Sequence, residues 1–404
     1  MMMMKRHCRR CRSRLGDDSS GGFFSLVRMG LVLFVLPFCC YSILIIISSS
    51  VAVAAATSST PVIGIMTQPL PNDDESNSTY IAASYVKWLE LGGARSIAIP
   101  YDATEDVLED IFYQVNGILL PGGALDILPD SMKYLWKLIL QANSGGNDTT
   151  SDFFPVWGTC LGFEWLIELA CSTSDAGDMA DDDDNNTCYL SPSYQAENIS
   201  LPLYNIPSES RLYPPNSSMK YNVQHYNLTM NNHHRGITPT NFNKSSQLTN
   251  LWYITSTNYD ILGSNQEFVS TIEPKHPNAF PIYGVQYHPE KNIFEYVTFS
   301  KSNIPYESID HTIEGISMSF ELSKFFVNLT RHNMNLQQRQ RHKQQGHVRR
   351  VHEYTKFETY PYVYIYPIQL GVYHFEQIYI IPPSTSAHSL ASSETATSVS
   401  ATAS

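Results

Sequence analysis

The feature that most constrains the fold is an alternation of short apolar runs and helical patterns between residues 61 and 171. Candidate strands lie at residues 61–68, 95–100, 117–120 and 154–157, and candidate helices at 80–91, 104–113 (capped by Thr104), 131–142 and 161–171. Strands that alternate with helices form parallel sheets, and their ends lie along one edge. The pattern therefore predicts an α/β fold with a central, mostly parallel sheet.

The second half of the chain is less regular. Apolar β-prone runs return at residues 267–273, 281–287 and 360–381, and a helical pattern covers 308–328. Residues 198–250 are polar and are predicted to be irregular. An acidic insertion near residues 174–186 and a polar basic linker near 332–350 interrupt the domain, and the Ser/Thr/Ala-rich tail 383–404 is predicted to be disordered. The acidic insertion lacks the ligand spacing of a calcium loop, so no metal site is predicted.

A cysteine between two glycines marks one of the predicted strand ends. The stretch FPVWGTCLGFEWLIELACS covers residues 154–172, and Cys160 stands where the apolar run passes into the helical pattern. A sharp strand-to-helix turn exposes a side chain at the edge of a sheet, and glycines relieve its clashes. We therefore predict that Cys160 is a nucleophile, although a tight turn with an inert cysteine would have the same pattern.

The same turn predicts how the thiol is activated. The free N–H groups and dipole of a helix N-terminus favour a thiolate, so we expect a lowered pKa for Cys160. Leu161 follows the cysteine, and Gly122 and Gly123 follow another predicted strand. The backbone N–H groups of Leu161 and Gly123 are the candidate oxyanion hole, in which each donor typically contributes about 3 kcal/mol.

A histidine at a later strand end can serve as the base. The segment GVQYHPEK covers residues 284–291 and places His288 after an apolar run, with Glu290 two residues on. A catalytic thiol needs an imidazole to accept its proton, and the imidazole needs an acceptor that holds its tautomer. We predict these roles for His288 and Glu290, against the alternative of a hydrogen-bonded structural histidine.

The first 56 residues have the order of a secretory signal. A basic block, KRHCRRCRSR, precedes an apolar run, LVLFVLPFCCYSILIII, and small residues follow. Cleavage of the segment and its retention as a membrane anchor both remain open, as does a start codon placed too far upstream. The expected destination is a vacuole, a lysosome or the outside of the cell, and contact with a membrane is expected only if the anchor is retained.

Sequons and cysteines agree with export. The chain carries eight N-x-S/T sequons, at Asn77, Asn147, Asn185, Asn198, Asn216, Asn227, Asn243 and Asn328. Outside the targeting segment only Cys160, Cys171 and Cys188 remain, and an odd number suggests one free thiol and one disulfide. If Cys171 pairs with Cys188, Cys160 is the free thiol; three reduced cysteines are the alternative.

The formal net charge of −12 argues against nucleic acid and against an acidic membrane surface as partners. It does not exclude an anionic substrate, because a pocket on an acidic protein can be locally basic. The sequence leaves the oligomeric state open, including a homodimer.

Three motifs together resemble a known family. WGTCLGFE, LLPGG and GVQYHPEK are similar to the class I glutamine amidotransferase superfamily and, within it, to the gamma-glutamyl hydrolases of peptidase family C26. The likeness runs from about residue 61 to 328 and includes PVIGIMTQP and HFEQIYI near His374. It implies a flavodoxin-like three-layer fold over residues 57–382. It also implies hydrolysis of folylpoly-gamma-glutamates through an acyl-enzyme, without a cofactor.

The resemblance also assigns roles to residues. It makes Cys160 the nucleophile, His288 the base and acid, and Glu290 the orienting carboxylate. In the segment NHHRGI it places a substrate-side histidine at His233, with His234 as the alternative. Because the implied substrate is anionic, three cations are candidates for its carboxylates: Arg235, Lys275 and Lys291.

Two other functions remain open. A glutaminase subunit that delivers ammonia would use the same three residues, but it would need a partner domain. An exported binding glycoprotein would have the same fold but would catalyse no reaction. Incubation with folyl-polyglutamate and with glutamine separates the three hypotheses.

Overall fold

The computed structural model describes residues 60–70, 78–125, 127–144, 153–172, 188, 190–299, 301–333, 368–370 and 373–381. The chain divides into two units, Met1–Ala56 and Thr57–Ser404, and the described residues belong to the second. The predicted targeting segment, the acidic insertion, the tail and residues 334–350 of the linker lie outside the described residues.

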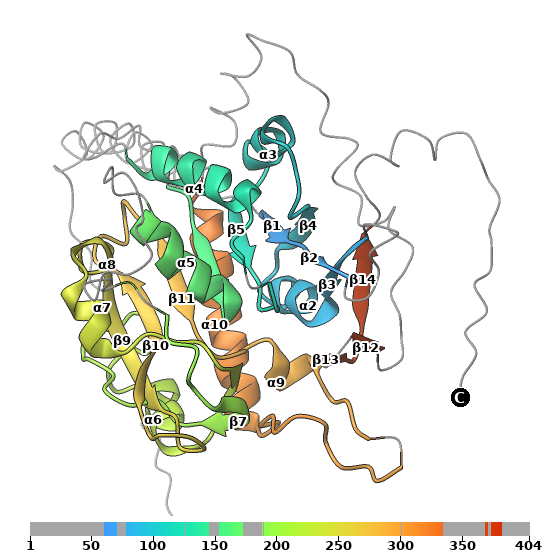
Figure 1. Cartoon of the computed structure of the whole chain (residues 1–404), viewed down its shortest axis with the longest axis vertical. Helices are drawn as coiled ribbons and strands as arrows, with labels where there is room; N and C mark the ends of the chain where they lie inside the picture. The colour runs from blue at the N-terminus through green and yellow to red at the C-terminus, as the bar shows by residue number, and fades with distance from the viewer. Residues whose placement is uncertain are drawn as a thin grey trace, which may run out of the picture. The chain divides into compact units, whose positions relative to one another are not determined.

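A seven-stranded sheet forms the centre of the second unit (Figure 1). Its order is β4 (Arg95–Ile99), β1 (Val62–Met66), β5 (Gly117–Leu120), β6 (Val156–Thr159), β11 (Ile282–Val285), β10 (Glu267–Pro274) and β9 (Trp252–Tyr259). Neighbours from β4 to β11 are parallel, whereas β10 is antiparallel to both β11 and β9. The predicted α/β fold with a mostly parallel central sheet is confirmed.

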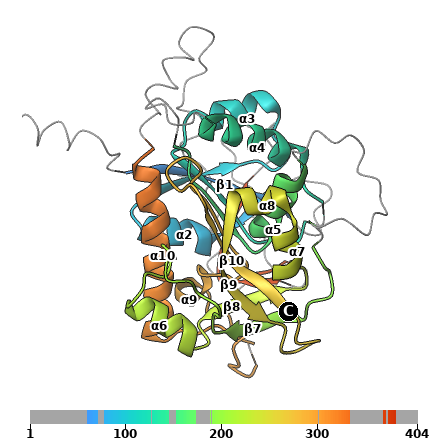
Figure 2. The same ribbon diagram turned by 90° about the vertical axis from the view of Figure 1, so that its left-hand side faces the viewer.

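Helices cover both faces of the sheet and complete three layers (Figures 1 and 2). One buried cluster includes α3 (Glu105–Phe112), α4 (Asp130–Asn143) and α5 (Leu161–Ser172), and the other includes α2 (Ala83–Leu91) and α10 (Ile313–Arg331). In β5, Ile118 and Leu120 face the first cluster and Leu119 the second. An apolar run can therefore stay buried on both sides, as central parallel strands require.

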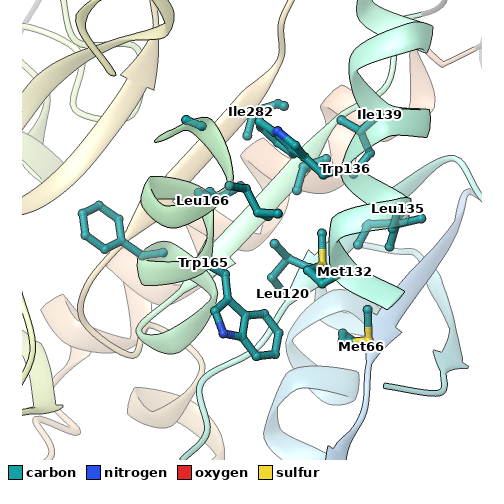
Figure 3. Packing of buried hydrophobic residues seen from close by; sticks show 14 of the residues in the cluster. Met66, Leu120, Met132, Leu135, Trp136, Ile139, Trp165, Leu166 and Ile282 are labelled. Atoms are coloured by element: carbon teal, nitrogen blue, oxygen red, sulfur yellow. The ribbon is translucent and has the colours of Figure 1, made fainter. Parts of the chain in front are cut away.

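The first cluster packs α4 and α5 over β5. Figure 3 shows Leu120 of β5 between Met132 of α4 and Trp165 of α5. These side chains are almost fully buried. Because α5 is held against the sheet along its length, its first residue has a defined place at the end of β6.

The structure corrects the sequence prediction at residues 80–91. They begin with a strand, β3 (Thr79–Ala82), and the helix starts only at Ala83. β3 lies between β2 (Gln68–Pro69) and β14 (Ile378–Ile381) in a separate sheet. A local pattern could not predict this strand, because its partner β14 comes from the far end of the chain. Thr104 precedes α3 as expected, but its hydroxyl donates to Asp106 and does not cap the helix.

The region predicted to be irregular contains regular structure. It holds β7 (Ala196–Leu201), α6 (Ser218–His225), β8 (Thr229–His233), α7 (Pro239–Lys244) and α8 (Ser246–Leu251). These elements are short and polar, so the packing of the folded chain and not local propensity stabilises them. The remaining elements are α9 (Lys291–Phe294), β12 (Ile368–Leu370) and β13 (Tyr373–Phe375).

A disulfide joins Cys171 at the end of α5 to Cys188, and it leaves Cys160 as a free, buried thiol. Of the two cysteine arrangements that the sequence left open, the structure contains the paired one. In the described part of the chain, no helix is both long and apolar enough to cross a membrane.

Candidate active site

Cys160 occupies a left-handed turn between β6 and α5. Its φ is 51°, a conformation that residues with side chains adopt rarely. A Cβ on Gly162 would lie 2.1 Å from the carbonyl oxygen of Leu120, and one on Gly158 would lie 2.7 Å from the carbonyl oxygen of Gly162. Both glycines are therefore required for the close approach of helix and strands, and the predicted turn is present.

His288 follows β11 and lies next to Glu290. Its Nδ1 is 2.8 Å from Oε1 of Glu290, and both residues are buried. The backbone N–H of His288 donates to the carbonyl oxygen of Met230 at 2.8 Å, which ties the histidine to β8. A proton on Nδ1 satisfies the bond to the carboxylate and leaves Nε2 as the proton acceptor.

Tyr85 of α2 connects the histidine to the Gly122 loop. Its hydroxyl oxygen accepts the N–H of Gly122 at 2.7 Å and lies 3.3 Å from Nδ1 of His288. Burial, and then the charge of Glu290, raise the pKa of Tyr85 well above its usual value, so the phenol keeps its proton. Tyr85 could not be predicted from the sequence, because a tyrosine in a helical apolar pattern is typical of a core residue.

These side chains line one pocket at the carboxyl ends of β1, β5, β6 and β11. Its lining comprises Gln68, Tyr80, Ile81, Ala82, Ser84, Tyr85, Pro121, Gly122, Gly123, Cys160, Asn232, His288, Glu290, Lys291 and Phe375. A Cβ on Gly122 would lie 2.6 Å from Cε1 of His288 and 3.4 Å from Cβ of Cys160. The side chains of Cys160 and His288 therefore both lie close to this glycine, and a side chain there would collide with the imidazole.

The expected lowering of the thiol pKa is wrong for this site. Burial, followed by the charge of Glu164, raises the pKa of Cys160 above its ordinary value. The ammonium group of Lys291 and the N–H of Leu161 act in the opposite direction, but they do not offset the loss of solvent. Cys160 is only 5% exposed. The resting group is thus a thiol, and a base must remove its proton when it attacks.

The two predicted loop glycines differ in what their backbones can do. The N–H of Gly122 is already bonded to Tyr85, whereas Gly123 lines the pocket beside the side chain of Gln68. The N–H of Leu161 lies beside the thiol of Cys160, where it acts to lower the pKa of that thiol. The N–H groups of Gly123 and Leu161 therefore remain the candidates for an oxyanion hole.

His233 is close to the pocket but is not among its lining residues. Its Nδ1 is 2.8 Å from the carbonyl oxygen of Arg235, and its Nε2 is 3.3 Å from Oδ1 of Asn231. Burial lowers the pKa of His233 to about 4, so the imidazole is neutral at physiological pH. Its neighbour His234 lies on the surface, with 60% of its side chain exposed. The residue of this segment that does line the pocket is Asn232.

The structure separates the three candidate cations. Arg235 binds Glu164 and Glu168 outside the pocket, so its predicted role at a substrate carboxylate is not supported by its position. Lys275 lies over the ring of Tyr253, also away from the pocket lining. Only the third candidate, Lys291, reaches the pocket.

Lys291 is 7% exposed, and its ammonium group binds the carboxylate of Glu307. Burial acts to lower its pKa, but the carboxylates of Glu307, Glu290 and Glu295 together more than offset this, so the pKa is raised and the charge is kept. Glu307 also accepts a hydrogen bond from Asn232 at 3.2 Å. A positive charge is therefore held at the pocket beside His288 and Glu290.

Comparisons with known proteins agree with these motifs. A protein-family model for peptidase C26 matches residues 61–143. Gamma-glutamyl hydrolase B of Dictyostelium discoideum is 35% identical over 81% of this chain and 84% of its own length. The human gamma-glutamyl hydrolase is 33% identical over 69% of this chain and 80% of its own length, and gamma-glutamyl hydrolase 1 of Arabidopsis thaliana is 33% identical over 68% and 73%.

Among solved structures, a Trypanosoma brucei CTPS glutaminase domain with bound acivicin aligns with 67% of this chain and 94% of that chain. The sequence identity is 13% and the TM-score is 0.42.

Proposed function

The chain belongs to the gamma-glutamyl hydrolase family, peptidase C26, and from this premise we propose that it cleaves folates carrying a poly-gamma-glutamate tail. It is an enzyme that hydrolyses gamma-glutamyl amide bonds. The observation that carries the proposal is that Cys160, at its left-handed turn, lines one pocket with the hydrogen-bonded pair of His288 and Glu290.

The reaction begins with a protonated thiol. Sγ of Cys160 attacks the gamma-carbonyl carbon while its proton passes to Nε2 of His288. Glu290 holds Nδ1 and stabilises the imidazolium that forms. We assign the stabilisation of the developing oxyanion to the N–H groups of Gly123 and Leu161. The imidazolium then protonates the leaving amine, and a thioester of the glutamyl group remains on the cysteine.

Hydrolysis of the thioester restores the enzyme. Water gives a proton to Nε2 of His288 and attacks the thioester carbonyl, and the proton returns to the departing Cys160 sulfur. Every proton in both halves of the reaction is thus moved by groups that line the pocket.

The substrate is strongly anionic, and Lys291 is the cation best placed for one of its carboxylates. Lys291 keeps its charge although it is buried, because Glu307 neutralises it from one side. An ammonium group has three donors, so a substrate carboxylate can share it with Glu307.

We propose an acidic compartment of the secretory route, or the outside of the cell, as the site of action. The signal-like N-terminus and the eight sequons support this. So does the protonation of buried carboxyl groups: burial raises the pKa of both Glu164 and Glu295 to about 7.

Product analysis tests the function. The purified protein is incubated with a folyl-polyglutamate and, separately, with glutamine, and the released glutamate species, folates and ammonia are measured. Shortened folates without ammonia from glutamine are expected. Cys160→Ala should abolish turnover while the protein still folds, because the side chain lies at a turn outside the main apolar contacts. More than a few percent residual hydrolysis would refute the assignment of the nucleophile.

A further inference from the structure

Gln68, the first residue of β2, carries a buried carboxamide that lines the pocket. The residue is 3% exposed and lies in the same pocket as Cys160 and His288. Within the part of the chain that the structure describes, neither Nε2 nor Oε1 of Gln68 has a hydrogen-bond partner. Leaving buried polar groups without partners destabilises a fold. A carboxamide of this kind in a reactive pocket points to a ligand that completes its hydrogen bonds.

The position of the carboxamide narrows what that ligand group can be. The side chain packs on Gly123, so closely that a Cβ there would lie 2.3 Å from Oε1 and 2.6 Å from Cδ of Gln68. Gly123 is also the candidate donor to the carbonyl that Cys160 attacks. The carboxamide therefore faces the part of the substrate next to the scissile carbonyl.

In a gamma-glutamyl substrate, two methylene groups join the gamma-carbonyl to the α-carbon. That α-carbon carries a free carboxylate at every position of a gamma-linked chain. It is the nearest charged group to the reacting carbonyl, and it is also what distinguishes a gamma-glutamyl bond from a simple side-chain amide.

We propose that Gln68 binds this α-carboxylate and so determines specificity at the acyl side of the scissile bond, an inference that rests on the proposed function. The NH₂ group of the carboxamide donates a charge-assisted hydrogen bond to the carboxylate. Its carbonyl oxygen accepts the amide N–H on the same α-carbon. Both unused atoms of Gln68 then gain partners, and the buried side chain has a reason to be polar.

The test is a kinetic cycle between enzyme and substrate. The wild type and Gln68→Met are assayed on a gamma-glutamyl peptide with a free α-carboxylate at the attacked residue, and on the same peptide with that carboxylate converted to a carboxamide. Methionine keeps the length of glutamine and removes its donor and acceptor. We expect Gln68→Met to lose 10-fold or more in kcat/KM on the free carboxylate, mainly through KM, and less than 3-fold on the carboxamide.

Equal losses on the two peptides would overturn the assignment, because a residue that serves the oxyanion or the fold affects both alike. Absence of wild-type turnover on the free-carboxylate peptide would instead overturn the proposed function, and this assignment with it. Gln114→Met is the control: Gln114 is partly buried outside the pocket, where its NH₂ group donates to the carbonyl oxygen of Asp110 at 2.7 Å. It should leave both rates unchanged.

Thermal unfolding without substrate gives a second, independent measurement. Because the carboxamide has no described partner in the free protein, its replacement by methionine should leave Tm unchanged or raise it. A clear fall in Tm would show that Gln68 is needed for the fold and would contradict a ligand-binding role.

Discussion

Replacing Glu295 by glutamine should stabilise the protein at neutral pH and leave its stability at pH 4 unchanged. Glu295 is 2% exposed, and its Oε2 accepts the backbone N–H of Glu376 at 2.7 Å. Burial raises its pKa from 4.5 to about 7. A carboxyl group with a raised pKa contributes stability below its unfolded pKa, and that contribution is lost as the pH rises through the folded one. The expected window is pH 4.5 to 7.

The magnitude follows from the same shift. Each pKa unit corresponds to about 1.4 kcal/mol, so ionisation of Glu295 should cost the folded state about 3 kcal/mol above pH 7. The side chain is almost fully buried, so solvent screening reduces this little. Glutamine keeps the size of the side chain and an oxygen that can accept the Glu376 N–H, but it does not ionise. The variant should therefore match the wild type at pH 4 and exceed its free energy of unfolding by about 3 kcal/mol at pH 8.

Urea unfolding at pH 4, 5, 6, 7 and 8, at constant ionic strength, measures this difference. Glu321→Gln is the control, because Glu321 is 47% exposed on α10 and pairs with Lys324 at the surface. Its effect should be small and nearly independent of pH. A Glu295→Gln variant that differs from the wild type by the same amount at every pH, or that is less stable at pH 8, would refute the reasoning.

The wild type itself should show the combined effect. Glu164 has its pKa raised to about 7 by burial and adds to the loss of stability with rising pH. Burial lowers the pKa of His233 to about 4, so the stability that this residue contributes to the protein is lost as the pH falls from 6.5 towards 4. Its effect on the pH dependence is therefore opposite to that of the carboxyl groups. Burial also raises the pKa of Glu273, so three carboxyl groups oppose one imidazole and the stability of the wild type should fall as the pH rises from 4.5 to 6.5.

Three further predictions concern the active-site loop and the disulfide. Because its pKa is raised, Cys160 of the free enzyme should react slowly with iodoacetamide at pH 7 and should accelerate only above pH 8.5; rapid alkylation at pH 6 would indicate a thiolate instead. Gly122→Ala should lower kcat at least 10-fold without unfolding the protein, since its Cβ would lie 2.6 Å from Cε1 of His288, and unchanged kcat in steady-state assays would contradict the geometry. Cys171→Ser opens a disulfide that joins residues 17 apart and should cost about 3 kcal/mol in urea unfolding, whereas an unchanged midpoint would show that the bridge is not needed.

The turn around Cys160 could be predicted from the sequence because its requirements are local. Cys160 has a positive φ, and two residues before it and two residues after it the backbone packs closely against other backbone atoms. Only glycine fits at those two positions, and Gly158 and Gly162 occupy them. The contact between His288 and Glu290 was predictable for the same reason, since the two residues are only two positions apart in the chain. Arg235 shows the limit of such reasoning, because a cation close in sequence to His233 lies outside the pocket and pairs with Glu164 and Glu168.

Residues that reach the pocket from distant parts of the chain were not predictable. Phe375 at the end of β13 lines it, and the next strand, β14, is the one that pairs with β3. Gln68 and Tyr85 show no local signal, since a polar residue at a strand end and an aromatic residue on a helix are common. Their roles depend on which groups the fold places around them.

The sequence by itself determined the α/β class, the strand-to-helix turn and the Cys, His and Glu side chains, because alternation, glycine spacing and short motifs act over a few residues. Only the tertiary structure decided the state of the thiol. A helix N-terminus favours a thiolate, but the loss of solvent around Cys160 and the nearby charge of Glu164 outweigh it and raise the pKa. Burial is a property of the whole packed molecule, so no short segment of the chain can report it.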